Sequence, residues 1–332
     1  MRESLAIALF AVLGAAGCGD ASADIQAAEH GKRLNLVAGD NADDAAGSSS
    51  PQSGSVETPL PPHAAAASAS FRDVAGFVLT DAKTQAQQLT QWLLNEDGDQ
   101  LLTRTCPVKA AGGVNFGDCR RWSRPVAIAE IGLSAPIRSF SSYLFAQTSQ
   151  TTLVQVAFNM AGNERLERTC RVNGGEVAWA SCSNWIALEE SAAGLGVPQQ
   201  TAFDDEVVVP YVDDDGIASF TQQLIASSGE SVWSRTCSTA AGEVPGVGGA
   251  CAFLPAVRIS AIGIHFDAVQ GVGGYTYTDG ASSIYAQTVV AANGIDASRR
   301  LCPVTTHGVA FEKCLGWETV TLADLSQQGA AL

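Results

Sequence analysis

Residues 155–170 read QVAFNMAGNERLERTC, and this stretch returns in three further versions along the chain. In every version a glutamine lies fifteen positions before a cysteine, a glycine lies eight before it and an arginine two before it. The cysteines themselves recur at intervals of 64, 67 and 65 residues. A fixed period of this length predicts four copies of one structural unit. The matching residues are Gln91, Gly98, Arg104 and Cys106; Gln155, Gly162, Arg168 and Cys170; Gln222, Gly229, Arg235 and Cys237; Gln287, Gly294, Arg300 and Cys302.

Each copy has the sequence pattern of antiparallel strands. Runs such as Leu153–Phe158 are rich in strand-forming residues, and Asp97-Gly98 and Asn293-Gly294 are typical of hairpin turns. A second strand carries the arginine and the cysteine. A third is expected over the pattern aromatic-x-x-Cys-x-x-Trp, and an earlier run such as Tyr143–Phe145 supplies a fourth. We therefore expect about four strands in each unit, with a disulfide joining two neighbours.

The predicted fold is all-β, with four antiparallel repeats of about 65 residues that form a small β-propeller. Two tandem β-sandwiches are the alternative, because periodicity alone does not separate the two arrangements. The expected repeats cover residues 70–133, 134–196, 197–264 and 265–332. The arrangement of strands is also loosely similar to that of repeat lectins with propeller folds, and this resemblance implies a glycan ligand.

Composition narrows the classes of function. Of the 332 residues, 46% are hydrophobic and 16% charged, which suits one or two packed domains. The formal net charge is -15, so the chain repels phosphate backbones and nucleic acid is not an expected partner. The 33 glycines and only two methionines favour strands and turns over long helices.

The N-terminus reads as an export signal. An apolar run from Leu5 to Ala16 is too short to span a membrane as a helix and ends at Gly17-Cys18. Residues 13–18 resemble the lipobox of bacterial lipoproteins, which implies a signal peptide over residues 1–17 and an acylated Cys18 that anchors the chain in the membrane. Gly19 after the cysteine implies the outer membrane or cell surface, with a periplasm-facing position as the alternative. An ordinary secretory signal is the other interpretation.

A linker and a folded region follow the anchor. Residues 18–69 are rich in Ala, Ser, Gly and Pro and are expected to be a disordered tether, whereas residues 70–332 hold the four repeats. Nine cysteines are an odd number, and Cys18 explains the odd one. The other eight fall into close pairs that predict four disulfides and an oxidising compartment. The expected bonds are Cys106 to Cys119, Cys170 to Cys182, Cys237 to Cys251, and Cys302 to Cys314.

The repeated polar and aromatic residues admit two interpretations. A structural role is the simpler, since an arginine beside a disulfide stacks on an aromatic ring and a tryptophan fills the space between sheets. In the functional interpretation, equivalent residues line four binding sites for glycan. The candidate ligand-binding residues are Trp122, Trp185 and Trp317; Arg104, Arg168, Arg235 and Arg300; and Gln91, Gln155, Gln222 and Gln287.

The third copy departs from this pattern. It has Gly248 and Leu254 where the other copies have an aromatic residue and the tryptophan. The acidic run Asp213, Asp214 and Asp215 before it is a weak calcium candidate; otherwise no metal or cofactor is predicted. No catalytic motif is present, so no catalytic residues are assigned.

The sequence thus predicts a lipid-anchored envelope or surface protein that presents a non-catalytic domain for binding glycan or an envelope protein. A structural scaffold in envelope assembly is the first alternative. A glycan-active hydrolase with two carboxylates about 5–10 Å apart in a cleft is the second.

Overall fold

The computed structural model describes residues 70–321 except 82, 110–112, 115, 135, 147–149, 189–201 and 240–250. The predicted signal peptide, Cys18 and the linker over residues 18–69 lie outside the described residues. In the part that is described, no helix has the length and apolar character needed to cross a membrane.

The first two sheets each follow the chain as an antiparallel meander. In each, a short closing strand returns to pair with the third long strand. Blade 1 contains β1 (Phe71–Thr80), β2 (Gln87–Asn95), β3 (Gln100–Lys109), β4 (Gly113–Val114) and β5 (Val126–Ala127). Blade 2 contains β6 (Ile137–Ala146), β7 (Thr151–Asn159), β8 (Arg165–Asn173), β9 (Glu176–Val177) and β10 (Ile186–Leu188).

The other two sheets repeat this arrangement, and each of the four sheets lies within one expected repeat. Blade 3 contains β11 (Phe203–Val212), β12 (Ala218–Ala226), β13 (Ser231–Ser238) and β14 (Val257–Arg258). Blade 4 contains β15 (Val269–Asp279), β16 (Ser282–Ala291), β17 (Asp296–Thr305), β18 (Gly308–Val309) and β19 (Glu318–Thr321).

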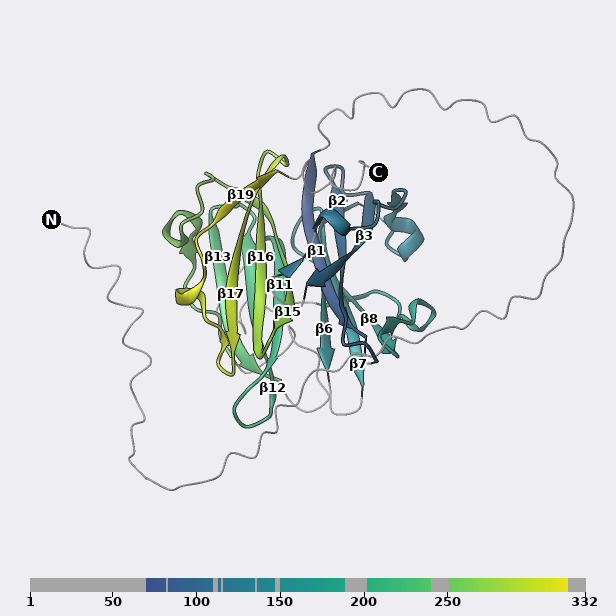
Figure 1. The fold of residues 1–332 in the computed structure, drawn as a ribbon. Helices are drawn as coiled ribbons and strands as arrows, with labels where there is room; N and C mark the ends of the chain where they lie inside the picture. Colours follow the sequence, from purple (N-terminus) through teal and green to yellow (C-terminus); the bar gives the residue numbers. More distant parts are fainter. Residues whose placement is uncertain are drawn as a thin grey trace, which may run out of the picture. The chain divides into compact units, whose positions relative to one another are not determined.

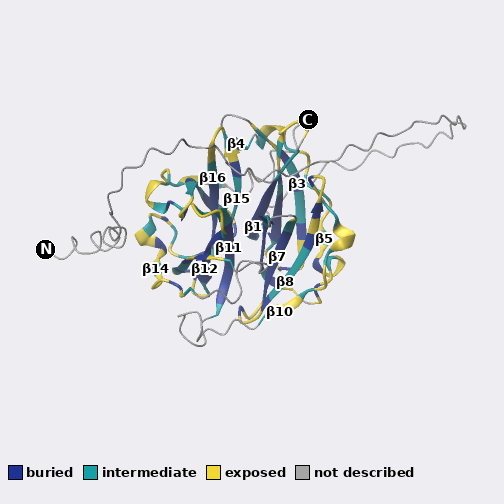
Figure 2. Cartoon of the chain, turned by 90° about the horizontal axis from the view of Figure 1, so that it is seen from below, coloured by how far each residue is buried: buried dark blue, intermediate teal, exposed yellow. Residues whose placement is uncertain are grey.

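The first strand of each sheet forms the centre of the molecule. Strand β1 packs against β6 and β15, and β11 packs against the same two strands, so the four inner strands form a closed ring. Figure 2 shows these strands as the most buried part, with exposed residues on the outer loops. The fold is therefore a four-bladed β-propeller, as predicted, and the tandem-sandwich alternative is wrong.

The repeated glycine links each blade to the next. Gly98, Gly162, Gly229 and Gly294 lie in the hairpin turns with φ between 67° and 72°, which favours glycine. Each glycine carbonyl also accepts a hydrogen bond from the first residue of the next inner strand. The donors, with their distances to these four carbonyls in turn, are Ile137 (2.9 Å), Phe203 (2.9 Å), Val269 (3.0 Å) and Phe71 (2.8 Å). The last of these bonds joins blade 4 to blade 1.

The third predicted strand is wrong. The segment aromatic-x-x-Cys-x-x-Trp begins as a short 3-10 helix instead, in η1 (Phe116–Asp118), η3 (Trp179–Ser181) and η5 (Phe311–Lys313). The chain turns there so that the second cysteine comes back against the third strand of its blade. Two more 3-10 helices, η2 (Ile128–Ile131) and η4 (Ile259–Ile262), connect blade 1 to blade 2 and blade 3 to blade 4.

All four disulfides are present with the expected partners, one in each blade. Each joins the third strand to the segment that follows it, rather than two neighbouring strands as expected. Disulfides on this scale are typical of proteins that fold outside the reducing cytoplasm.

Blade 4 meets blade 1 through backbone atoms. Gly273 on β15 lies so close to β1 that an added Cβ would be 1.5 Å from the carbonyl oxygen of Val74. We expect Gly273→Ala to lower the free energy of unfolding by more than about 3 kcal/mol, because backbone atoms cannot move aside cheaply. Thermal unfolding followed by circular dichroism measures the effect.

Gly316→Ala is the matched control, because nothing lies within 4 Å of its Cβ position and its backbone is not left-handed. It should change the free energy of unfolding by less than about 0.5 kcal/mol. Equal stability of the two variants would contradict the close contact between blades 4 and 1.

Candidate functional site

The repeated arginine and glutamine meet in every blade. They face each other across the second and third long strands, where the register pairs Gln91 with Arg104 and the other three pairs likewise. In each pair the arginine Nε donates to the glutamine Oε1. The distances are 3.0 Å for Arg104 to Gln91, 2.8 Å for Arg168 to Gln155, 2.6 Å for Arg235 to Gln222 and 2.8 Å for Arg300 to Gln287.

An aromatic ring covers each guanidinium group. The guanidinium carbon lies 4.4 Å from the ring centre of Trp122 in blade 1, 4.8 Å from Trp185 in blade 2 and 4.4 Å from Trp317 in blade 4. In blade 3 the ring is that of Phe253, at 4.5 Å. The repeat pattern does not reveal this aromatic, because Phe253 follows its cysteine by two positions where the tryptophans follow by three.

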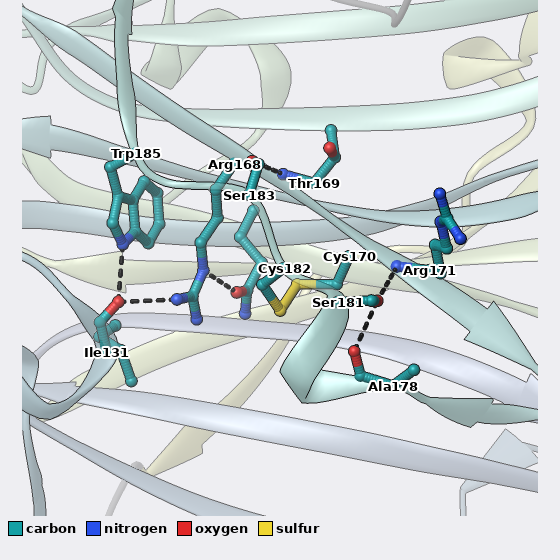
Figure 3. The surroundings of a disulfide bond; sticks show 11 residues. Ile131, Arg168, Thr169, Cys170, Arg171, Ala178, Ser181, Cys182, Ser183 and Trp185 are labelled. Atoms are coloured by element: carbon teal, nitrogen blue, oxygen red, sulfur yellow. Dashed lines mark hydrogen bonds between the residues drawn. A yellow bond between two sulfur atoms is a disulfide. The ribbon is translucent and has the colours of Figure 1, made fainter.

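The tryptophans are also bonded to the segments that connect the blades. The indole N–H of Trp185 donates to the carbonyl of Ile131 in η2 at 2.8 Å, and Trp317 donates to Ile262 in η4 at 2.9 Å. Arg168 Nη1 donates to the same Ile131 carbonyl at 2.7 Å. Figure 3 shows Trp185 and Arg168 converging on this carbonyl beside the disulfide of Cys170 and Cys182.

In each blade the glutamine, the arginine and the ring that covers it form one group, which we call a station. The four stations lie inside the interfaces between blades. The four glutamines and Arg104, Arg235 and Arg300 are buried, while Arg168 and the three tryptophans are half-buried. Burial lowers the pKa of Arg104 and of Arg300 to about 10, which leaves both charged at neutral pH. Each ring already has one face against a guanidinium group. The geometry gives these residues a packing role, and ligand binding by them stays a prediction.

The interface between blades 1 and 2 differs from its equivalent between blades 3 and 4. In the latter, Gln287 Nε2 donates to Gln223 Oε1 at 2.6 Å. The residue of blade 1 in the place of Gln223 is Trp92, which has an N–H and no acceptor. Accordingly, Trp92 Nε1 and Gln155 Nε2 are buried, and neither has a hydrogen-bond partner in the described part of the chain. This interface therefore contains two N–H groups that lack acceptors.

An exposed tryptophan borders the same interface. Trp179 in η3 is 48% exposed, and its ring lies edge-on to Trp92 with 6.1 Å between ring centres and 86° between planes. Its equivalents in blades 1 and 4, Phe116 and Phe311, instead lie 5.5 Å from Arg104 and Arg300. In the sequence, Trp179 is the aromatic residue of the pattern aromatic-x-x-Cys-x-x-Trp in the second copy. The signal in the sequence is a tryptophan where the first and fourth copies have phenylalanine.

The acidic candidates do not form a metal centre. Asp213 Oδ1 accepts from the backbone N–H of Asp215 and Ile217, and its Oδ2 accepts from Ser219 Oγ, so turn formation uses its oxygens. Asp214 lies 3.6 Å from the exposed His307. Within the described ranges, no group of three or more His, Cys, Asp or Glu side chains is arranged to hold a metal ion.

Carboxyl groups from different blades do meet, but not as a hydrolase pair. Asp73 and Asp205 hydrogen-bond to each other and are 1% and 0% exposed. Glycoside hydrolysis uses carboxyl groups about 5–10 Å apart with a sugar between them. A hydrogen-bonded, buried pair leaves no room for a sugar ring.

No family model matches the chain, and no curated protein matches its sequence. Solved structures with a similar fold include an endo-arabinase from Bacteroides thetaiotaomicron VPI-5482, at 10% identity and TM-score 0.35 over 74% of this chain and 80% of that one. A thermostable family-43 glycoside hydrolase has 8% identity and TM-score 0.37 over 74% and 70%. The Aleuria aurantia lectin with alpha-methyl-L-fucoside has 9% identity and TM-score 0.34 over 76% and 80%. Likenesses of this size assign neither a ligand nor a reaction.

The station in blade 2 yields a stability prediction. Trp185→Ala should lower the free energy of unfolding by about 3 kcal/mol, since it removes the ring over Arg168 and the bond to Ile131. Trp185→Phe keeps the ring and should cost only about 1 kcal/mol. Urea unfolding of both oxidised variants tests the packing role. If Trp185→Ala were as stable as the unchanged protein, the packing role would be excluded.

Proposed function

We propose that this protein is a non-catalytic, exported binding domain that holds glycan against the exposed indole of Trp179. The observation that carries the proposal is the position of this side chain. Trp179 is 48% exposed, whereas its two equivalents, Phe116 and Phe311, lie against guanidinium groups. An exposed indole offers a flat, electron-rich face to the C–H groups of a sugar ring.

The indole is held in place from behind. Trp92 meets it edge-on, and Phe140 on β6 in turn meets Trp92 edge-on with 5.6 Å between ring centres. Because Trp92 and Phe140 are buried, little side-chain freedom remains to be lost when a ligand binds. A rigid aromatic side chain that is half exposed is therefore ready to stack against a ring.

Polar groups accompany the indole on its own blade. Arg171 on β8, Glu176 on β9 and Ser181 in η3 are all exposed. The hydroxyl of Ser181 links η3 to β8, since it accepts from the Arg171 N–H at 2.9 Å and donates to the Ala178 carbonyl at 2.6 Å. Exposed charged and hydroxyl groups on the same blade as an exposed aromatic side chain suit a ligand with both hydroxyl and C–H surfaces.

The absence of catalysis belongs to the same proposal. The buried pair of Asp73 and Asp205 has no access to a substrate. The carboxylates of Glu167 in blade 2 and Glu206 in blade 3 also lie near each other, but both are ion-paired with the buried Arg165. Export is supported by the four disulfides, which take up eight of the nine cysteines. Cys18 is the ninth, and we propose that it carries the acyl anchor in the outer membrane or at the cell surface.

A glycan array probed with the purified, oxidised protein tests the proposal, with calcium and again with a chelator. Trp179→Ala should lower the affinity for the bound glycan at least about fivefold, because an aromatic anchor at a binding site contributes more than about 1 kcal/mol. The fold should be retained, since half of the Trp179 side chain is already in solvent.

Phe311→Ala is the matched control, because it removes the aromatic residue at the same repeat position in blade 4. It should leave glycan binding unchanged. Equal losses in both variants, or binding that ignores Trp179→Ala, would contradict the site. A blank array would overturn glycan binding and favour an envelope protein, to be sought by crosslinking from position 179.

A further inference from the structure

Two aspartates from opposite blades meet at the centre of the ring. Asp73 on β1 and Asp205 on β11 hydrogen-bond to each other and are almost fully buried. Two ionised carboxylates in contact without solvent repel each other strongly, so such a pair retains a proton. The contact thus depends on a proton shared by the two side chains.

The same side chains hold the neighbouring inner strands. Each aspartate accepts one N–H from the residue that follows it and one from the next blade. The donors are Val74 (2.6 Å) and Phe140 (2.8 Å) for Asp73, and Glu206 (2.7 Å) and Val272 (2.6 Å) for Asp205. Asp73 therefore binds blade 1 to blade 2, and Asp205 binds blade 3 to blade 4.

The propeller accordingly consists of two blade pairs. Within each pair, an aspartate and the tryptophan bond to η2 or η4 connect the blades. The bond between Asp73 and Asp205 joins one pair to the other. It is the one axial contact of the described residues that requires a proton, so loss of the proton acts on the contact between pairs rather than within them.

Other charges around the axial pair are matched to partners of their own. Arg138 on β6 pairs with Asp204 at 2.6 Å, and Arg165 on β8 pairs with Glu206 at 2.7 Å. The positive charge of Arg72 on β1 lowers the pKa of Asp73. The charge of Asp205 raises the pKa of Tyr285 on β16. Burial nevertheless dominates and raises the pKa of Asp73 to about 6, while burial and the charge of Asp73 raise the pKa of Asp205 well above its ordinary value.

We propose that the proton shared by Asp73 and Asp205 is a pH-dependent link between the two blade pairs, called the fastener below. Release of this proton loosens the ring. The contact between blades 4 and 1 is the place where loosening begins. It joins the two ends of the blade sequence and has no buried ion pair among the described residues, whereas blades 2 and 3 share Arg165 and Glu206.

The direction of the effect follows from the raised pKa values. A carboxyl group with a higher pKa in the folded state binds a proton there that the unfolded chain has already released. Its contribution to stability is complete below about pH 4 and is lost as the pH rises through the folded pKa, which is about 6 for Asp73 and well above its ordinary value for Asp205. The ring is therefore tighter in acid than in mild base.

Hydrogen exchange of the full chain at about pH 5 and about pH 8.5, corrected for intrinsic exchange, tests the fastener. Amides of β1 and β15 should lose protection about tenfold or more at the higher pH. Asp205→Asn should abolish this difference, because an amide keeps a donor toward Asp73 but does not ionise. Its overall stability should fall, since the amide cannot accept from both Glu206 and Val272.

Asp204→Asn is the matched control, because burial also raises the pKa of Asp204 to about 6. It should retain the pH dependence of β1 and β15. If Asp204→Asn abolished the dependence while Asp205→Asn kept it, the fastener would be wrong. A measurement on the unchanged protein is independent of variant folding. Carbon-13 NMR of labelled aspartate should show that a buried carboxyl of this pair titrates near or above about pH 6, as the raised pKa of Asp73 requires. Titration of both buried carboxyls below about pH 5 would overturn the proposal.

Discussion

Closure of the ring between the last blade and the first is the constraint on which the rest of this structure depends. Blade 4 and blade 1 are the ends of the repeat, so non-covalent contacts must hold them. The carbonyl of Gly294 accepts a hydrogen bond from the N–H of Phe71. The glycines of β15 allow its backbone to lie against β1. Glycine at these positions is thus required by the closed ring rather than by strand formation, which it disfavours.

The two interfaces between blade pairs are built differently although the repeats are alike. Glu206 follows Asp205 and forms a bidentate ion pair with the buried Arg165 of blade 2. At the equivalent places between blades 4 and 1, Val74 packs in one apolar cluster with Ala297. A buried ion pair adds little net stability, but a charge placed opposite an alanine would be left unpaired at high cost. The difference therefore favours one order of the blades over pairing of equivalent faces in the wrong order.

The repeat allowed the fold, the hairpin glycines and the cysteine pairing to be predicted, because each depends on residues at fixed spacing. The 3-10 helices were missed because an aromatic, a cysteine and a tryptophan three apart fit a strand and a turn equally well. Phe253 was missed because a one-residue shift hides an equivalent ring from spacing arguments. The axial pair was out of reach for a different reason: Asp73 and Asp205 are 132 positions apart in sequence and only ring closure brings them together.

The way each arginine is satisfied explains why one aromatic is free. In blade 1 the two terminal nitrogens of Arg104 have no hydrogen-bond partner among the described residues, and the rings of Phe116 and Trp122 lie against the guanidinium group. In blade 2 the carbonyl of Ile131 accepts a hydrogen bond from Arg168, so a second ring is not needed there. Trp179 therefore lies edge-on to Trp92, whereas its equivalents in blades 1 and 4 pack on a guanidinium group. A packing requirement met by a backbone carbonyl thus leaves a tryptophan available at the surface.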